Sequence, residues 1–158
     1  LNVQIWTNER KERIDMATII QSQLEEVGIK AEIKVLEWGA YLDGLKQKTH
    51  DMFILGWVAS VPDPEFAVAR VFHSSMVGST NFSYFVNPDV DKMMEQGKAL
   101  PNGPEREKLY KDLQEKIDSL TPWVYLHNDE QICGTQKNIK GFQPSPRGYH
   151  VLTNVSFE

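Results

Sequence analysis

The sequence predicts an α/β fold with a mixed, mainly parallel sheet and helices packed on both of its faces. Residues 1–58 alternate between strand-like and helix-like patterns, which favours parallel strands joined by helical crossovers. Phe53–Val58 is almost unbroken apolar sequence, whereas residues 29–35 alternate apolar with charged side chains. A continuous apolar run is typical of a strand covered on both faces. We therefore expect Phe53–Trp57 to form a central strand and residues 29–35 to lie near a sheet edge.

Composition limits the class of protein. The 158 residues allow one domain with a real core, and 41% hydrophobic content indicates a globular chain. The net charge of -5 argues against nucleic acid as a partner, because phosphate binding needs clustered Lys and Arg. The lone cysteine, Cys133, cannot form an internal disulfide and is expected to be a buried thiol. The four histidines have no ligand-like spacing, so we expect no metal site, and no motif indicates a cofactor.

The first half of the chain has readable helix boundaries. Residues 1–7 alternate as a strand, and Asn8 is a candidate N-cap for the helix that follows. Residues 9–27 carry apolar side chains at helical spacing, and Gly28 stands where a C-terminal cap belongs. Residues 39–48 are predicted to be a second helix before the central strand.

Prolines divide the second half. Glu65–Phe72 is predicted to be a short helix, Asn87–Pro88 supplies an N-cap with a first-turn proline, and Pro104 begins the next helix. Trp123–Ile132 and Val151–Phe157 are strand candidates.

The loop after Phe53–Val58 is the best candidate for a ligand site. Pro62 and Pro64 should make it extended and stiff, and an open α/β sheet binds ligands beyond the carboxyl ends of its strands. Trp57 is either a core aromatic or a cleft wall, and Asp63 either caps the helix at Glu65 or contacts ligand.

An aromatic pair is the second candidate. Tyr84 and Phe85 either pack beneath their loop or place one ring in the cleft, and we expect the latter. Ser74 and Ser75 stand beside His73, but no nucleophile-elbow motif surrounds them, so we assign no catalytic residue.

The order and spacing of short motifs across nearly the whole chain resemble the extracytoplasmic solute-binding proteins of family 5, the peptide- and nickel-binding components of ABC importers. The motifs are Leu24–Ile29, Glu37-Trp38, Tyr41-Leu42, Asp51-Met52, Gly56-Trp57, Asp63-Pro64, Asn81-Phe82, Asn87-Pro88, Arg106 with Leu109-Tyr110, Pro122, and Pro144–Pro146 with Gly148.

Members of this family have two lobes around a cleft, and residues 1–158 resemble most of the C-terminal lobe. The resemblance implies a type II periplasmic-binding-protein-like lobe, a fragment that forms one wall of a peptide site. It implies as partners a peptide ligand, the N-terminal lobe of the same protein and the membrane permease of the transporter. It also implies an extracytoplasmic location, in a periplasm or lipid-anchored on the outer face of the cell membrane. A lobe separated from its partner lobe is expected to self-associate through the cleft face.

One position departs from the dipeptide binders of the family. These proteins place an acidic residue three positions after the Trp, where it pairs with the peptide α-ammonium; here Ser60 stands there. The sequence is closer to members that take oligopeptides. The expected ligand-binding residues are therefore Trp57, Ser60, Asp63, Tyr84 and Phe85.

Other functions remain open at this stage. Nickel complexes, oligosaccharides and haem are alternative ligands within the same family. A small α/β enzyme using Asp51, Asp63 and Glu65 is a further alternative, but no base, stabiliser and nucleophile can be assembled around them. We expect a binding protein without enzymatic activity.

Overall fold

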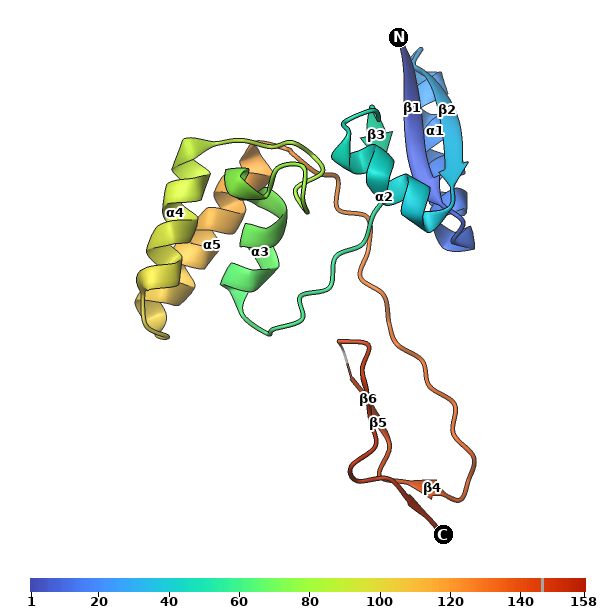
Figure 1. Ribbon diagram of the computed structural model, residues 1–158, viewed down its shortest axis with the longest axis vertical. Coiled ribbons are helices and arrows are strands. Elements are labelled where there is room, and N and C mark those ends of the chain that lie inside the picture. The colour runs from blue at the N-terminus through green and yellow to red at the C-terminus, as the bar shows by residue number, and fades with distance from the viewer. Residues whose placement is uncertain (146) are drawn as a thin grey trace.

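The computed structural model describes residues 1–145 and 147–158. Figure 1 shows a small sheet with its helices, a second group of helices beside it, and an extended C-terminal arm. The sheet contains β1 (Asn2–Asn8), β2 (Lys30–Leu36) and β3 (Met52–Phe53). Its strand order is β2-β1-β3, and both pairings are parallel. The predicted α/β class with parallel crossovers is confirmed.

Helices cover both faces of this sheet, as predicted. Ile5 on β1 packs with Ala17 of α1 (Lys11–Glu26), whereas the next residue, Trp6, packs with Tyr41 of α2 (Trp38–Lys46). Successive side chains of a strand point to opposite faces, so one strand joins two separate apolar clusters. Gly44 allows close contact on the α2 side, because a Cβ there would lie 2.3 Å from the Trp6 ring.

The predicted place of Phe53–Trp57 is wrong. Only Met52 and Phe53 pair with β1, and β3 lies at an edge of the sheet. The central position belongs to β1, where even Thr7 is fully buried. The apolar run leaves the sheet after Ile54 and becomes exposed from Gly56 to Val58. Residues 29–35 behave as expected, since β2 forms the other edge.

Of the two residues predicted to cap α1, Gly28 does so and Asn8 does not. Gly28 has a φ of +80° and closes α1, with its N–H donating to Glu25 and the next N–H to Leu24. Asn8 does not cap α1, which begins after Arg10; the Asn8 carbonyl oxygen Oδ1 instead accepts from the Arg13 guanidinium at 3.0 Å.

The three helices after the loop share one core. They are α3 (Pro64–Phe72), α4 (Pro88–Ala99) and α5 (Pro104–Ser119), with a short 3₁₀ helix η1 (Ser74–Met76) after α3. Asn87 caps α4 through its side chain, as predicted. The buried residues of this cluster are Val71, Phe72, Val90, Met94, Tyr110, Leu113 and Ile117.

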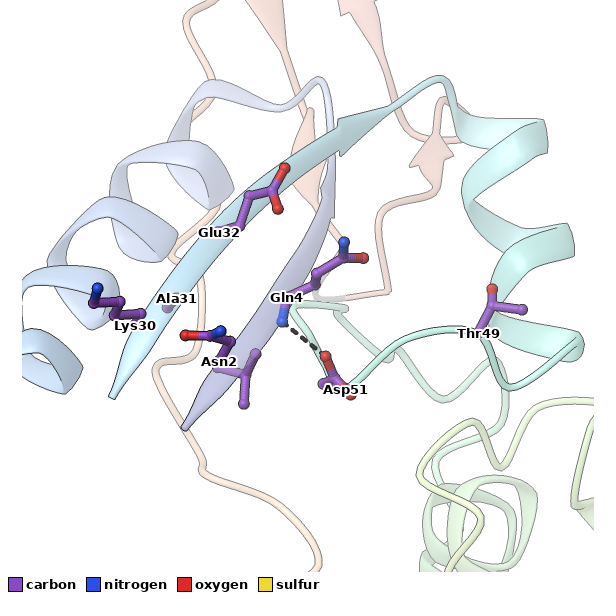
Figure 2. Close-up of a pocket in the computed structure, with 8 residues that line it drawn as sticks. Asn2, Gln4, Lys30, Ala31, Glu32, Thr49 and Asp51 are labelled. Carbon is purple, nitrogen blue, oxygen red and sulfur yellow. Dashed lines mark hydrogen bonds between the residues drawn. The ribbon is translucent and has the colours of Figure 1, made fainter. Parts of the chain in front are cut away.

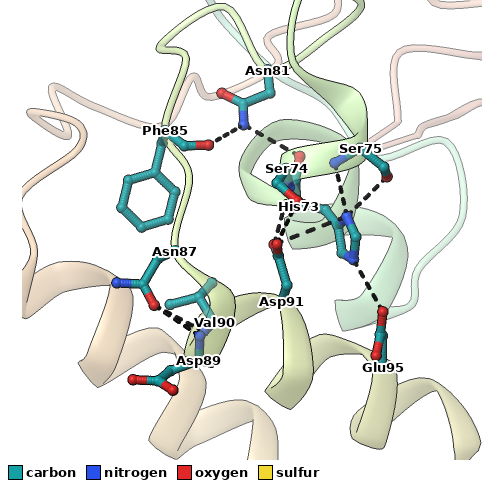
Figure 3. Close-up of polar contacts among 10 residues, drawn as sticks. All are labelled: His73, Ser74, Ser75, Asn81, Phe85, Asn87, Asp89, Val90, Asp91 and Glu95. Carbon is teal, nitrogen blue, oxygen red and sulfur yellow. Dashed lines mark hydrogen bonds and ion pairs between the residues drawn. The ribbon is translucent and has the colours of Figure 1, made fainter.

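The segment from His73 to Phe85, which joins α3 to α4, is fastened to α4 by polar contacts (Figure 3). Asp91 accepts hydrogen bonds from the backbone N–H and the hydroxyl of Ser74, and His73 lies 3.9 Å from both Asp91 and Glu95. The buried Asn81 donates to the carbonyls of His73 and Phe85, which holds the two ends of the loop together.

In its described residues, 120–145 and 147–158, the C-terminal arm contains four two-residue strands in two antiparallel ribbons. They are β4 (Ile139–Lys140) with β7 (Ser156–Phe157) and β5 (Gln143–Pro144) with β6 (His150–Val151). The predicted strand Trp123–Ile132 is absent from this part of the described chain, because its backbone runs extended without a partner strand. Val151–Phe157 is two short strands rather than one. Cys133 is exposed in the arm, so its predicted burial is also wrong.

One ion pair ties the proline loop to the helices. Asp63 Oδ1 accepts from the N–H of Glu65 at the start of α3 and from Arg106 Nη2 of α5, both at 2.8 Å. Arg106 also donates to the Gly97 carbonyl of α4 and to the Asn102 side chain. The Arg106 hydrogen bond lowers the pKa of the Asp63 carboxyl below its ordinary value of 3.8.

We expect Gly44→Ala to lower the free energy of unfolding by about 1–3 kcal/mol, because the added methyl group overlaps the buried Trp6 ring. Gly39→Ala in the same helix gains similar helix propensity, but its Cβ meets only the exposed carboxylate of Glu37, which caps the helix, and no buried ring. Urea unfolding of both variants measures the difference. Equal stability of the two would contradict close packing of α2 on β1.

We expect Asp63→Asn to destabilise the protein near pH 7, since Asn still caps α3 but loses the charge that pairs with Arg106. Asp63→Ala should cost about 1 kcal/mol more, because it also removes the cap. The folded-state pKa of Asp63 is lowered, so the pair contributes fully above the unfolded pKa and is lost as pH falls through the folded pKa. Thermal unfolding of wild type and Asp63→Asn should therefore converge in acid; a constant difference down to pH 2 would exclude the pair as its source.

Candidate functional site

The best candidate site lies beyond the carboxyl end of β3, where the sheet ends and the proline loop begins. Trp57 is 39% exposed there and is flanked by the exposed Gly56 and Val58. Within the described residues, the N–H groups of residues 55–61 donate to no backbone carbonyl. The segment is irregular, with bends at Ser60 and Val61, and it presents unpaired backbone donors beside an aromatic ring, at the place where open α/β sheets bind ligands.

Ser60 and Asp63 lie on the same loop but in different surroundings. Ser60 is exposed, and its carbonyl oxygen accepts from Arg147 of the arm at 3.2 Å. Asp63 is a helix cap and the partner of Arg106, so the capping interpretation of this residue accounts for its contacts.

Tyr84 and Phe85 have protein partners on opposite sides of their loop. The Tyr84 hydroxyl donates to the carbonyls of Leu45 and Lys46 at the end of α2. Phe85 packs edge-on against Phe72, with ring centroids 6.1 Å apart, on the helix cluster. Both side chains are half-buried, and these contacts correspond to the packing interpretation of the pair.

Sequence reasoning missed Arg13. Its Nη1 donates to Asn8 at the end of β1, and a Cβ placed on Gly56 would lie only 3.3 Å from its Nη2. The guanidinium thus lies between the end of β1 and Gly56, the residue before Trp57. The available signal was position: Arg13 lies on the same helical face as Ala17 and Ile20, where a charge is unexpected.

Two hollows lie elsewhere on the surface. Figure 2 shows the larger, of about 580 Å³, over the amino-terminal parts of β1 and β2, where Asp51 accepts the Gln4 N–H. It lies at the opposite end of the strands from Trp57 and is lined mainly by polar side chains. The smaller, of about 250 Å³, lies between Pro62 and the start of α5 around the Asp63–Arg106 pair. Each of the three guanidinium nitrogens of Arg106 donates to a protein acceptor there.

The His73 cluster does not form a hydrolytic triad. Both the N–H and the hydroxyl of Ser75 contact His73 Nδ1, which is the nitrogen that a triad carboxylate should hold. Asp91 is instead engaged by Ser74. Asp51 and Asp63, two of the carboxylates considered for a small α/β enzyme, do not share a site, since they line different hollows.

None of the helices in the described residues has both the length and the apolar character needed to cross a membrane.

Comparison with known proteins identifies relatives for the chain. Residues 2–79 match the family model described as bacterial extracellular solute-binding proteins, family 5 Middle. The dipeptide-binding protein of Escherichia coli is 30% identical over 145 residues, which are 90% of this chain and 27% of that protein. The haem-binding protein A of Haemophilus influenzae is 28% identical over 143 residues, 90% of this chain and 26% of that protein.

A solved structure agrees with these matches. The ABC transporter-associated periplasmic binding protein DppA from Helicobacter pylori, in complex with the peptide STSA, is similar with a TM-score of 0.73 and 29% identity, over 78% of this chain and 24% of that one. The chain spans about a quarter of the length of the curated relatives that it matches. These relatives are solute-binding proteins rather than enzymes, and the fold and sequence together show that the chain belongs to the extracellular solute-binding proteins of family 5.

Proposed function

We propose that residues 1–158 supply one lobe of the peptide-binding component of an ABC importer, which works outside the cytoplasm. The observation that carries this proposal is the segment 55–61, whose backbone donors are open beside the exposed Trp57. An extended peptide can pair with such a segment as an added strand, so that main-chain hydrogen bonds give affinity with little side-chain selectivity. The relatives named for dipeptide binding and the STSA complex support a peptide as the ligand.

The ligand is proposed to be an oligopeptide rather than a dipeptide. Ser60 is uncharged, and Asp63 is already bonded to Arg106, so neither offers a free carboxylate for a peptide α-ammonium. Affinity then depends on the length of backbone that pairs with the loop. The second lobe would close over the peptide, and the closed form would be read by the permease.

A peptide-length series tests this function. Calorimetry on the complete two-lobe protein with alanine peptides of two to five residues should show affinity that rises beyond the dipeptide. Haemin serves as the comparison ligand, because one relative is a haem-binding protein. Binding of haemin without binding of any peptide would contradict the proposal and favour haem.

We expect Trp57→Ala in the complete protein to weaken tetra-alanine binding by roughly tenfold or more, because a desolvated aromatic wall is typical of binding hot spots. Val27→Ala is the control, since Val27 is exposed beyond the opposite end of α1. Fluorescence titration measures both affinities. If the two variants bound equally well, with both folded, Trp57 would not face the ligand.

We expect the isolated chain to bind tetra-alanine more weakly than the complete protein. The chain offers one wall, so it lacks the contacts and the exclusion of water that a second lobe provides. Calorimetry with the same peptide compares the two proteins, and light scattering determines whether the isolated chain self-associates. Equal affinities would show that the site lies within this lobe alone.

A further inference from the structure

His50 lies where the sheet meets the segment that leads to α4. It stands between α2 and β3, and its Nε2 lies 3.1 Å from the carbonyl oxygen of Phe82. Because a carbonyl oxygen only accepts hydrogen bonds, Nε2 carries the hydrogen of the neutral ring and donates it. This bond fastens residues 81–84 to the sheet.

Aromatic rings surround the His50 imidazole. Its centroid lies 4.9 Å from that of Phe53, 6.1 Å from that of Trp6 and 6.3 Å from that of Tyr84. Phe82 itself packs in the same cluster as Trp6, and the Tyr84 hydroxyl donates to two carbonyls at the end of α2. Contacts from β1, β3 and residues 81–84 therefore converge on one ring.

The second nitrogen of this ring has no partner. Nδ1 is buried and forms no hydrogen bond with any of the residues that the structure describes. In the neutral ring it is an acceptor, whereas a second proton would make it a donor and place a positive charge among the rings. A buried charge or donor without a partner is costly, so the closed arrangement fits neutral His50 and not the imidazolium.

The electrostatics agree with this geometry. Burial is the largest influence on the His50 imidazole, and it lowers the pKa below its ordinary value of 6.5. The bond to Phe82 and the charge of Asp51 oppose this shift, and Lys48 adds to it. Asp51 is exposed and already accepts the N–H of Gln4, so its attraction does not reverse the effect of burial.

The other charged side chains beside these rings are cations. Lys48 holds its ammonium 4.9 Å from the Tyr84 ring centroid, and Lys34 of β2 holds its own 4.2 Å from the Trp6 ring centroid. The Tyr84 hydroxyl is the titratable group of residues 81–84 and is neutral in mild acid. The end of α2 contributes uncharged carbonyls. A proton on His50 would thus add a third cation to this group.

We propose that His50 makes the junction between the sheet and residues 81–84 sensitive to acid, so that a second proton on its ring releases this segment. The imidazolium is better solvated in water than among the rings, and the segment opens to expose it. A group whose folded pKa is lowered stabilises the closed state above its unfolded pKa, and this contribution is lost as the pH falls toward the folded pKa. The junction is therefore closed at neutral pH and opens increasingly below about pH 6.5.

Thermolysin cleavage of the complete protein between residues 81 and 86 measures this opening. Phe82 is 7% exposed, so it must leave its cluster before it can be cut. The cleavage rate follows the population of the open state when opening and closing are fast. We expect the ratio of the wild-type rate to the His50→Gln rate to rise roughly threefold or more from pH 7.5 to pH 5.5. Gln stays neutral and keeps a donor for Phe82, and each ratio is taken at one pH, so changes in protease activity cancel.

Two other histidines supply controls. His73 lies beside the same segment, where its backbone carbonyl accepts from Asn81 (Figure 3), and His127 lies in the arm. His73→Gln and His127→Gln should both keep the acid-induced opening of the wild type. Loss of that opening in His73→Gln would assign the effect to the wrong histidine and overturn the proposal.

A ratio of wild-type to His50→Gln rates that stays constant with pH, with both proteins folded, would also overturn it. So would the absence of cleavage at either pH. An NMR titration of the His50 ring in the complete protein gives an independent reading. We expect a pKa below 6.5, and a value of 6.5 or higher would contradict the proposal.

Discussion

The bond between Asp63 and Arg106 is the constraint on which the rest of the structure depends. Asp63 ends the loop that carries Trp57 and begins α3, and Arg106 connects it to α4 and α5. The two apolar clusters around β1 contain no residue of these helices, so the two groups of elements meet through loops: Phe82 packs with Trp6, and the Tyr84 hydroxyl donates to the end of α2. Residues 55–61 run between two anchored ends, the paired strand β3 and the Asp63 cap of α3, and their N–H groups are unpaired, which suits a ligand-binding segment better than a free loop would.

Most of the predicted site residues near this loop already have partners within the protein, so few groups remain available to a ligand. The charges of Asp63 and Arg106 neutralise one another, and Tyr84 and Phe85 are used to seat a neighbouring loop on α2 and α3. The groups that remain available at the strand ends are the Trp57 ring, the unpaired N–H groups of residues 55–61, and the Arg13 guanidinium, which donates one hydrogen bond to Asn8. Such a set can hold an extended chain of variable sequence, because two of its three elements recognise features that every peptide shares.

Local signals in the sequence predict much of the fold. Gly28 and Pro104 mark helix ends through their backbone chemistry and Asn87 through its side chain, and the alternation of residues 29–35 places β2 at an edge. The error in the sheet concerns which strand lies at its centre, and that depends on contacts between residues far apart in the sequence. Phe53–Val58 is as apolar as a central strand, but β1 occupies that position, and no local pattern decides between them. Of the site, the sequence predicts the loop and Trp57; Arg13 could not be assigned, because its role arises where α1, β1 and Gly56 meet.

The central claim is that residues 55–61 form a strand edge that a peptide completes. Amide hydrogen exchange of the complete protein, with and without tetra-alanine, tests it most directly, since an N–H that gains a ligand carbonyl becomes protected. The account predicts fast exchange in this segment without peptide and clear protection with it, while β1 and β2 stay unchanged. Exchange that remains fast in residues 55–61 while the peptide is bound would contradict the account.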